Sequence, residues 1–173
     1  MNRLNRRFAF STLMMGAFFL SRIAFGWTEA ARAVTPPLLQ SEARAIFYAL
    51  LQERSAAVEN GVYSRIEPLY SHDEELVVFR PDLVLHGWKA VQAFWQRSLS
   101  HPRSDFRVYW NDDLVVTVEG DVIVGGLTWS NQSGDNPRRY GCLTLTLRRR
   151  DDRWVIVQEH SSNWTKPPST GSE

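Results

Sequence analysis

Cysteine is nearly absent from this chain of 173 residues, which contains Cys142 and no other. A single cysteine excludes an intramolecular disulfide framework, a thioredoxin-like pair of thiols and a zinc site built from cysteines. The four histidines are scattered, without the sequence spacing or the clustered carboxylates of a metal site. We therefore expect no metal, no cofactor and a fold whose stability depends on its hydrophobic core.

Positive charge is in short supply outside the N-terminal segment. Residues 1–33 hold five of the 20 Lys and Arg residues but one of the 19 Asp and Glu residues, which leaves 15 basic and 18 acidic residues and a net charge of −3 for the rest. This acidic body argues against a nucleic-acid partner. The length suits one domain, and a hydrophobic content of 43% suits a globular protein with a sizeable core.

The apolar run from Phe8 to Leu20 is too short for a transmembrane helix, which needs roughly 18–20 residues. It follows three arginines and precedes small residues, and these three parts together predict a signal peptide over residues 1–33. Arg6-Arg7 resembles the twin-arginine type of signal. We expect an exported protein, periplasmic or secreted, with no stable membrane anchor after cleavage; the cleavage site and the export route stay open.

Three helices are predicted in the first half of the remaining chain. Apolar residues at three- and four-residue steps indicate a long helix that begins near Pro36 and ends at Asn60-Gly61. Its stripe consists of Leu39, Ala43, Ile46, Phe47, Leu50, Arg54 and Val58. A short helix follows and Pro68 keeps it brief, while apolar spacing after Gly87 indicates a third helix over 88–99.

Seven β-rich runs complete the pattern, and short turns join most of them. Two short strands are predicted over 76–79 and 83–85, and five more over 106–110, 114–118, 122–129, 138–149 and 154–161. Short connections between consecutive strands indicate an antiparallel meander. We expect an α+β domain over 34–165, a cone-shaped barrel with the N-terminal helices packed on a strongly curved antiparallel sheet. A disordered tail over 166–173 is expected to follow.

Four short motifs follow one another along this domain. They are Glu59-Asn60-Gly61 before Pro68-Leu69-Tyr70, His86-Gly87-Trp88 before Phe94-Trp95, Glu119-Gly120-Asp121-Val122, and a last strand that leads to Glu159-His160-Ser161. Together they resemble the nuclear transport factor 2-like superfamily, also called SnoaL-like or ketosteroid isomerase-like, over roughly residues 38–163. The resemblance implies the conical fold and frequent homodimers. It leaves the function open, because the family holds isomerases, polyketide cyclases, dehydratases and non-enzymatic modules.

Aromatic residues are the candidates for ligand binding, because a conical pocket lined with them binds small apolar molecules. The chain has seven tryptophans, of which Trp95 and Trp129 are the better pocket candidates; packing in the core or at a dimer interface is the alternative role. Tyr48 and Tyr140 could donate a hydrogen bond to an oxyanion, although Tyr48 could equally face solvent. We expect a small, largely apolar organic ligand.

Three titratable residues are candidates for proton transfer. His86 ends a strand and precedes a helix, where it could reach the mouth of the cone or hydrogen-bond the free N–H groups of the helix. Glu159 and His160 are adjacent on the last strand, so their side chains point to opposite faces and only one of them can line a cavity. Periodicity does not decide which one, and burial would raise the pKa of the carboxyl group.

Two functions therefore remain open. The first is a non-catalytic binding or assembly module, or one without an assigned activity. The second is an isomerase, polyketide cyclase or dehydratase-type enzyme in which His86 acts with Glu159 or His160. We favour the binding module, because the sequence assigns no complete catalytic set.

Overall fold

The computed structural model describes residues 38–100 and 105–164 of the chain. The signal peptide predicted over 1–33, the helix start predicted near Pro36 and the tail predicted over 166–173 lie outside the described residues. Among the helices that are described, none combines the length and the apolar character that crossing a membrane would require.

The three predicted helices are present. Helix α1 spans Gln40–Asn60 and ends at Gly61, whose φ of 67° is the left-handed conformation that glycine adopts without strain. Helix α2 (Tyr63–Ile66) leads directly into a 3-10 turn, η1 (Glu67–Leu69). Helix α3 spans Gly87–Ser98.

Seven strands form one sheet in the described part of the chain. Their bounds are β1 (Val77–Arg80), β2 (Leu83–His86), β3 (Phe106–Trp110), β4 (Val115–Glu119), β5 (Val122–Ser133), β6 (Arg139–Arg150) and β7 (Arg153–Trp164). The strand order is β2-β1-β7-β6-β5-β3, and β4 pairs with the other half of the β5 edge. The predicted α+β class is confirmed, with the helices coming before most of the sheet.

The sheet is mixed, which corrects the expectation of an antiparallel one. Strand β1 runs parallel to β7, with Val78 opposite Glu159, while the other pairings are antiparallel. Tight turns dictate antiparallel pairing only for strands that they join, such as β5, β6 and β7. No such turn links β1 to β7, because α3 and five strands separate them in the chain.

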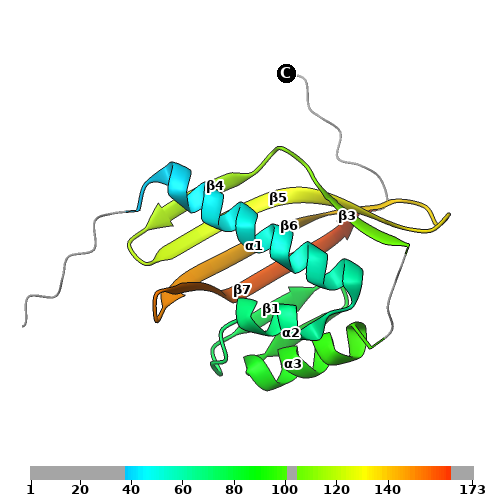
Figure 1. Cartoon of the computed structure of the whole chain (residues 1–173), viewed down its shortest axis with the longest axis horizontal. Coiled ribbons are helices and arrows are strands. Elements are labelled where there is room, and N and C mark those ends of the chain that lie inside the picture. Colours follow the sequence, from blue (N-terminus) through cyan, green and yellow to red (C-terminus); the bar gives the residue numbers. More distant parts are fainter. Residues whose placement is uncertain (1–37, 101–104, 165–173) are drawn as a thin grey trace, which may run out of the picture. The chain divides into compact units, whose positions relative to one another are not determined.

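The sheet is also open, so the expected cone-shaped barrel is not what the structure shows. It runs from β2 at one edge to β3 and β4 at the other, and these edges do not pair. The sheet is not strongly curled. It is nevertheless covered on one face, because α1 lies across it (Figure 1).

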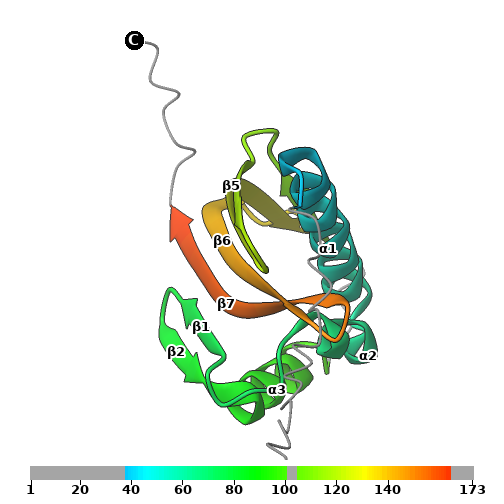
Figure 2. The same ribbon diagram turned by 90° about the vertical axis from the view of Figure 1, so that its left-hand side faces the viewer.

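We call the face that α1 covers the inner face. Fully buried Phe47 of α1 packs against Gly125 of β5 so closely that a Cβ atom at Gly125 would lie 2.5 Å from the Phe47 ring. The inward side chains of the long strands complete the core, among them Ile123, Leu145 and Leu147. Figure 2 shows α1 against this face. The β1–β2 hairpin and α3 lie on the side of β7 that is away from β6.

Candidate functional site

A cavity of about 980 Å³ lies among α1, α3 and the sheet. Aromatic rings from α3, β3 and β5 and from the end of β7 form much of its wall: Phe94, Trp95, Phe106, Trp110, Trp129 and Trp164. Its charged lining residues are Arg54, Arg80, Asp82, Arg138 and Arg139. The cavity therefore combines an aromatic wall with an excess of arginine, in a domain whose sequence is acidic overall.

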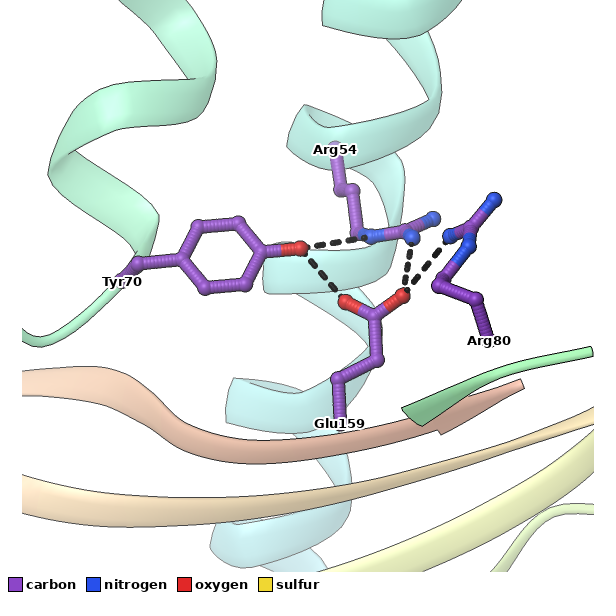
Figure 3. A network of polar contacts seen from close by, with 4 residues as sticks. All are labelled: Arg54, Tyr70, Arg80 and Glu159. Atoms are coloured by element: carbon purple, nitrogen blue, oxygen red, sulfur yellow. Dashed lines mark hydrogen bonds and ion pairs between the residues drawn. The ribbon is translucent and has the colours of Figure 1, made fainter. Parts of the chain in front are cut away.

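Two of these arginines also belong to a polar cluster of Arg54, Tyr70, Arg80 and Glu159, which we call the Arg54–Glu159 cluster (Figure 3). Arg54, Tyr70 and Glu159 are buried, and Arg80 is half-buried. Arg54 Nη2 donates to Glu159 Oε1 over 2.7 Å, and Arg80 Nη1 donates to the same oxygen over 3.2 Å. The Tyr70 hydroxyl donates to Glu159 Oε2 over 2.5 Å, and it accepts a longer bond of 3.4 Å from Arg54 Nε. A fully buried carboxylate is thus held by two guanidinium groups and one phenol.

Glu159 faces the core because β7 contains an irregularity. Leu145 pairs with Glu159 and Thr146 with Gln158, but Leu147 pairs with Ile156, so Val157 has no partner in the register. Without this extra residue, strict alternation from buried Ile156 would turn Glu159 outward and His160 inward. The bulge shifts the pattern by one residue, which buries Glu159 and leaves His160 exposed.

The partners of Glu159 reach it from three separate elements. Arg54 occupies the buried stripe of α1, one turn after Leu50. Tyr70 directly follows η1. Arg80 is two residues beyond Val78 on β1, and Val78 is opposite Glu159, so the Arg80 side chain lies on the inner face as well.

The Arg54–Glu159 cluster keeps the carboxyl group ionised. Burial alone would raise the pKa of Glu159, but the charges of Arg54 and Arg80 and the hydrogen bonds from Tyr70 and Arg54 bring that pKa below its ordinary value. The expectation of a raised pKa is therefore wrong, because it considered burial without the two arginines. Burial and the Glu159 charge raise the pKa of the Tyr70 phenol, so Tyr70 stays neutral and donates.

This electrostatic arrangement predicts acid sensitivity. The pKa of Glu159 is lower in the folded than in the unfolded chain, so its contribution to stability is complete above the ordinary value of 4.5 and is lost as the pH falls below it. Urea unfolding at a series of pH values from about 7 down to about 3 measures this loss. We expect the free energy of unfolding of a Glu159→Gln variant to depend less on pH over this range. Equal slopes for the variant and the wild type would contradict the assignment.

The three candidates for proton transfer are not brought together. His86 is exposed and pairs with Val77, which is next to Gln158 in the sheet, so its side chain shares the outer face with His160. The His160 and Phe79 rings form a T-shaped pair there, with 6.2 Å between their centroids. Glu159 alone of the three faces inward. His86 also makes no side-chain capping hydrogen bond to α3, so the alternative structural role expected for it is not observed.

The four candidates for ligand binding divide evenly. Trp95 and Trp129 are buried and line the cavity. Tyr48 does not line it; its hydroxyl donates to Asp112 over 3.3 Å near the surface and accepts from Arg44. Tyr140 is half-buried and is not among the lining residues either. Ligand binding by these residues stays a prediction, and the two tryptophans are the candidates that lie on the cavity wall.

Sequence reasoning missed the partners of Glu159, although one of them left a signal. Arg54 stood in the apolar stripe of the first predicted helix, and a charged residue in such a stripe is rarely buried without a partner. Tyr70 and Arg80 left no comparable signal. Tyr70 is near Glu159 because it bridges to Ile156 of β7, and Arg80 is near it because β1 pairs in parallel with β7.

The described lining residues suit the binding and orientation of a ligand. Among the described residues that line it, the only carboxylate is that of exposed Asp82, and there is no histidine. Within the same described part of the chain, no group of three or more His, Cys, Asp or Glu residues is placed to hold a metal ion. Arginine and tryptophan side chains, by contrast, supply hydrogen-bond donors and flat apolar surfaces.

Comparisons with known proteins agree with this architecture. Residues 48–166 match the model of the SnoaL-like domain family. A comparison with curated proteins gives no match. Among solved structures, an NTF2-like protein of unknown function from Pseudomonas putida is similar, with a TM-score of 0.63, 20% identity, and coverage of 72% of this chain and 89% of that one.

Two further structures extend the likeness. An NTF2-like superfamily protein from Salmonella enterica has a TM-score of 0.64 at 15% identity, over 78% of this chain and all of its own. An NTF2-like protein from Streptomyces avermitilis, suggested to be a dehydratase, has a TM-score of 0.64 at 17% identity, over 74% of this chain and all of its own. At these identities the likeness shows the fold and no activity.

Proposed function

Because this chain belongs to the SnoaL-like domain family, we propose that it binds a small, largely apolar organic molecule in the cavity on the inner face of its sheet. The observation that carries the proposal is the wall of six aromatic rings around a cavity of about 980 Å³. Pockets of this kind bind ligands through apolar contact, and a few polar groups fix the orientation of the ligand. No turnover is assigned to the protein.

Binding is better supported than the enzymatic alternative. Proton transfer by His86 with Glu159 or His160 needs two of these groups beside one substrate, but both histidines are on the outer face. Glu159 is paired with two arginines and its pKa is lowered, which makes it a weak base. The similar protein suggested to be a dehydratase shares the fold at 17% identity, which does not transfer its activity.

A cavity-filling substitution tests the proposal. Val108 lines the cavity, so a Val108→Trp variant places an indole in the space that the ligand would occupy. We expect the neutral dye N-phenylnaphthylamine to bind the wild type with enhanced fluorescence, and Val108→Trp to weaken this binding by about tenfold or more.

The matched control is Leu39→Trp, directly before α1, where the residue is 62% exposed and does not line the cavity. This variant carries the same added indole and is expected to bind the dye like the wild type. Equal dye affinity in the two tryptophan variants would contradict binding in this cavity, as would the absence of dye binding to the wild type.

We propose in addition that the mature protein is exported and forms a homodimer through the outer face of the sheet. The export proposal rests on the segment over 1–33, and the dimer proposal on apolar side chains that the outer face exposes, among them Phe79, Val115 and Val124. The native mass of the protein purified from the periplasm or medium tests both, because it gives the length of the mature chain and the number of chains in the assembly. A monomer, or a chain that retains Phe8–Leu20, would contradict the corresponding proposal.

A further inference from the structure

The charged residues of the cavity are strongly biased toward one sign. Among the described residues, four arginines line it, against the single carboxylate of Asp82. Arg54 is buried and Arg80 is half-buried, whereas Arg138 and Arg139 are exposed. A cavity lined in this way attracts anions, in a domain whose net charge would otherwise repel them.

We propose that the ligand is an organic monocarboxylate, whose carboxylate accepts hydrogen bonds from Arg80 while its apolar body lies against the tryptophans. This inference rests on the proposed function and adds the chemical class of the ligand. It goes beyond the apolar ligand expected from the aromatic wall alone.

The charge balance of the Arg54–Glu159 cluster favours a ligand with one negative charge. Arg54 and Arg80 carry two positive charges, and Glu159 supplies one negative charge, shared through Oε1. Tyr70 adds no charge, because burial and the neighbouring carboxylate keep its phenol protonated. Among the described residues, Glu159 is the only acidic partner of either arginine. The cluster thus retains one uncompensated positive charge, which a monoanion would balance.

Arg80 is the member of the cluster that can reach a ligand. Its side chain is 25% exposed, whereas those of Arg54 and Glu159 are 9% and 0% exposed. Arg80 uses Nη1 for Glu159, and Figure 3 shows the remainder of its guanidinium directed away from that carboxylate. A guanidinium has five N–H donors in a planar fork, so donors remain for a second carboxylate.

Aromatic rings hold the Arg80 guanidinium in place. Its Cζ atom lies 5.1 Å from the centroid of the Phe94 ring and 5.9 Å from that of Trp95. Cation–π contacts of this kind fix an arginine without consuming its hydrogen bonds. Because Trp95 also lines the cavity, a ligand held by Arg80 has an apolar surface beside it. This favours an organic acid over a small inorganic anion, which would leave the aromatic wall without a partner.

Three pairs of compounds test the charge requirement on the wild-type protein. Benzoate, naphthoate and biphenylcarboxylate are titrated by calorimetry against benzamide, naphthamide and biphenylcarboxamide, which have the same shape and no charge. We expect at least one acid to bind about 10- to 100-fold more tightly than its amide, since hydrogen bonds to charged groups are the strong ones. Added salt is expected to weaken the binding of the acid more than that of the amide.

Substitution of Arg80 tests the position of the carboxylate. Arg80→Gln is expected to weaken binding of the acid by about 10- to 100-fold, so that acid and amide bind equally, and to leave the affinity for the amide unchanged. Arg80→Lys retains the charge without the fork and is expected to recover part of the preference. The matched control is Arg65→Gln, which removes an arginine paired with Glu53 on the surface and outside the cavity. This control should bind both compounds like the wild type.

The outcomes distinguish failure of this inference from failure of the proposed function. Equal affinities for acid and amide would overturn the inference and leave the apolar pocket standing. An unchanged preference in Arg80→Gln would overturn the role of Arg80. Tighter binding of naphthyl phosphate, a dianion at neutral pH, than of naphthoate would overturn the assignment to monocarboxylates. If N-phenylnaphthylamine binds in the cavity but no member of any pair binds at millimolar concentration, the inference fails and the proposed function stands; if the dye does not bind either, both fail.

Discussion

Replacement of Glu159 by glutamine is expected to lower the free energy of unfolding by about 3–5 kcal/mol. The substitution keeps the size of the side chain but removes the only carboxylate that the described residues offer to Arg54 and Arg80. Arg54 is then a buried cation without a counter-ion, which is costly to keep away from water. Urea unfolding of the wild type and the variant measures the difference.

The matched control is Glu53→Gln. Glu53 also pairs with an arginine, Arg65, over 2.6 Å, but these side chains are 41% and 43% exposed. Solvent screens this pair, and its loss is expected to cost less than about 1 kcal/mol. Similar losses in Glu159→Gln and Glu53→Gln would show that the Arg54–Glu159 cluster is not buried in solution.

Replacement of Arg54 by methionine is expected to be the second large change, with a loss of about 3 kcal/mol. Methionine retains the apolar stem of the side chain, but Glu159 loses its shortest ion pair. The hydrogen bonds that Arg80 and Tyr70 donate to Glu159 remain. The same unfolding measurement applies. Arg80→Gln should cost less than Arg54→Met, because Arg80 is partly exposed and Arg54 retains its bond to Glu159.

A double variant distinguishes a broken ion pair from a packing defect. Arg54→Met combined with Glu159→Gln removes both buried charges, so the summed losses of the single variants are expected to exceed the loss of the double variant by about 0.5–3 kcal/mol. Strict additivity of the two substitutions would contradict direct coupling between these residues.

Much of the fold could be predicted from local patterns. The stripe of α1, the end of this helix at Gly61 and the strands after Phe106 each have a local cause in the sequence, and each is present. The direction of β1 beside β7 could not be predicted in this way, because no short connection links these strands. The open sheet could not be predicted either, since curvature follows from how whole strands pair.

The site was less accessible to sequence reasoning than the fold. Trp95 and Trp129 are the better pocket candidates among the seven tryptophans, and the structure puts both on the cavity wall. The choice between Glu159 and His160 depends on the single unpaired residue Val157, which breaks the alternation on which the prediction relies. His86 was attractive because it lies at a junction between a strand and a helix, but its register with Val77 directs it to the outer face.

The most direct test of the account is a crystal structure of the protein with naphthoate. We predict density for one naphthoate per chain in the cavity, with its carboxylate within hydrogen-bond distance of Arg80 and its rings against Trp95 and Trp129. Naphthoate bound only elsewhere, or an empty cavity under conditions in which calorimetry shows binding, would contradict the claim that this cavity is the ligand site.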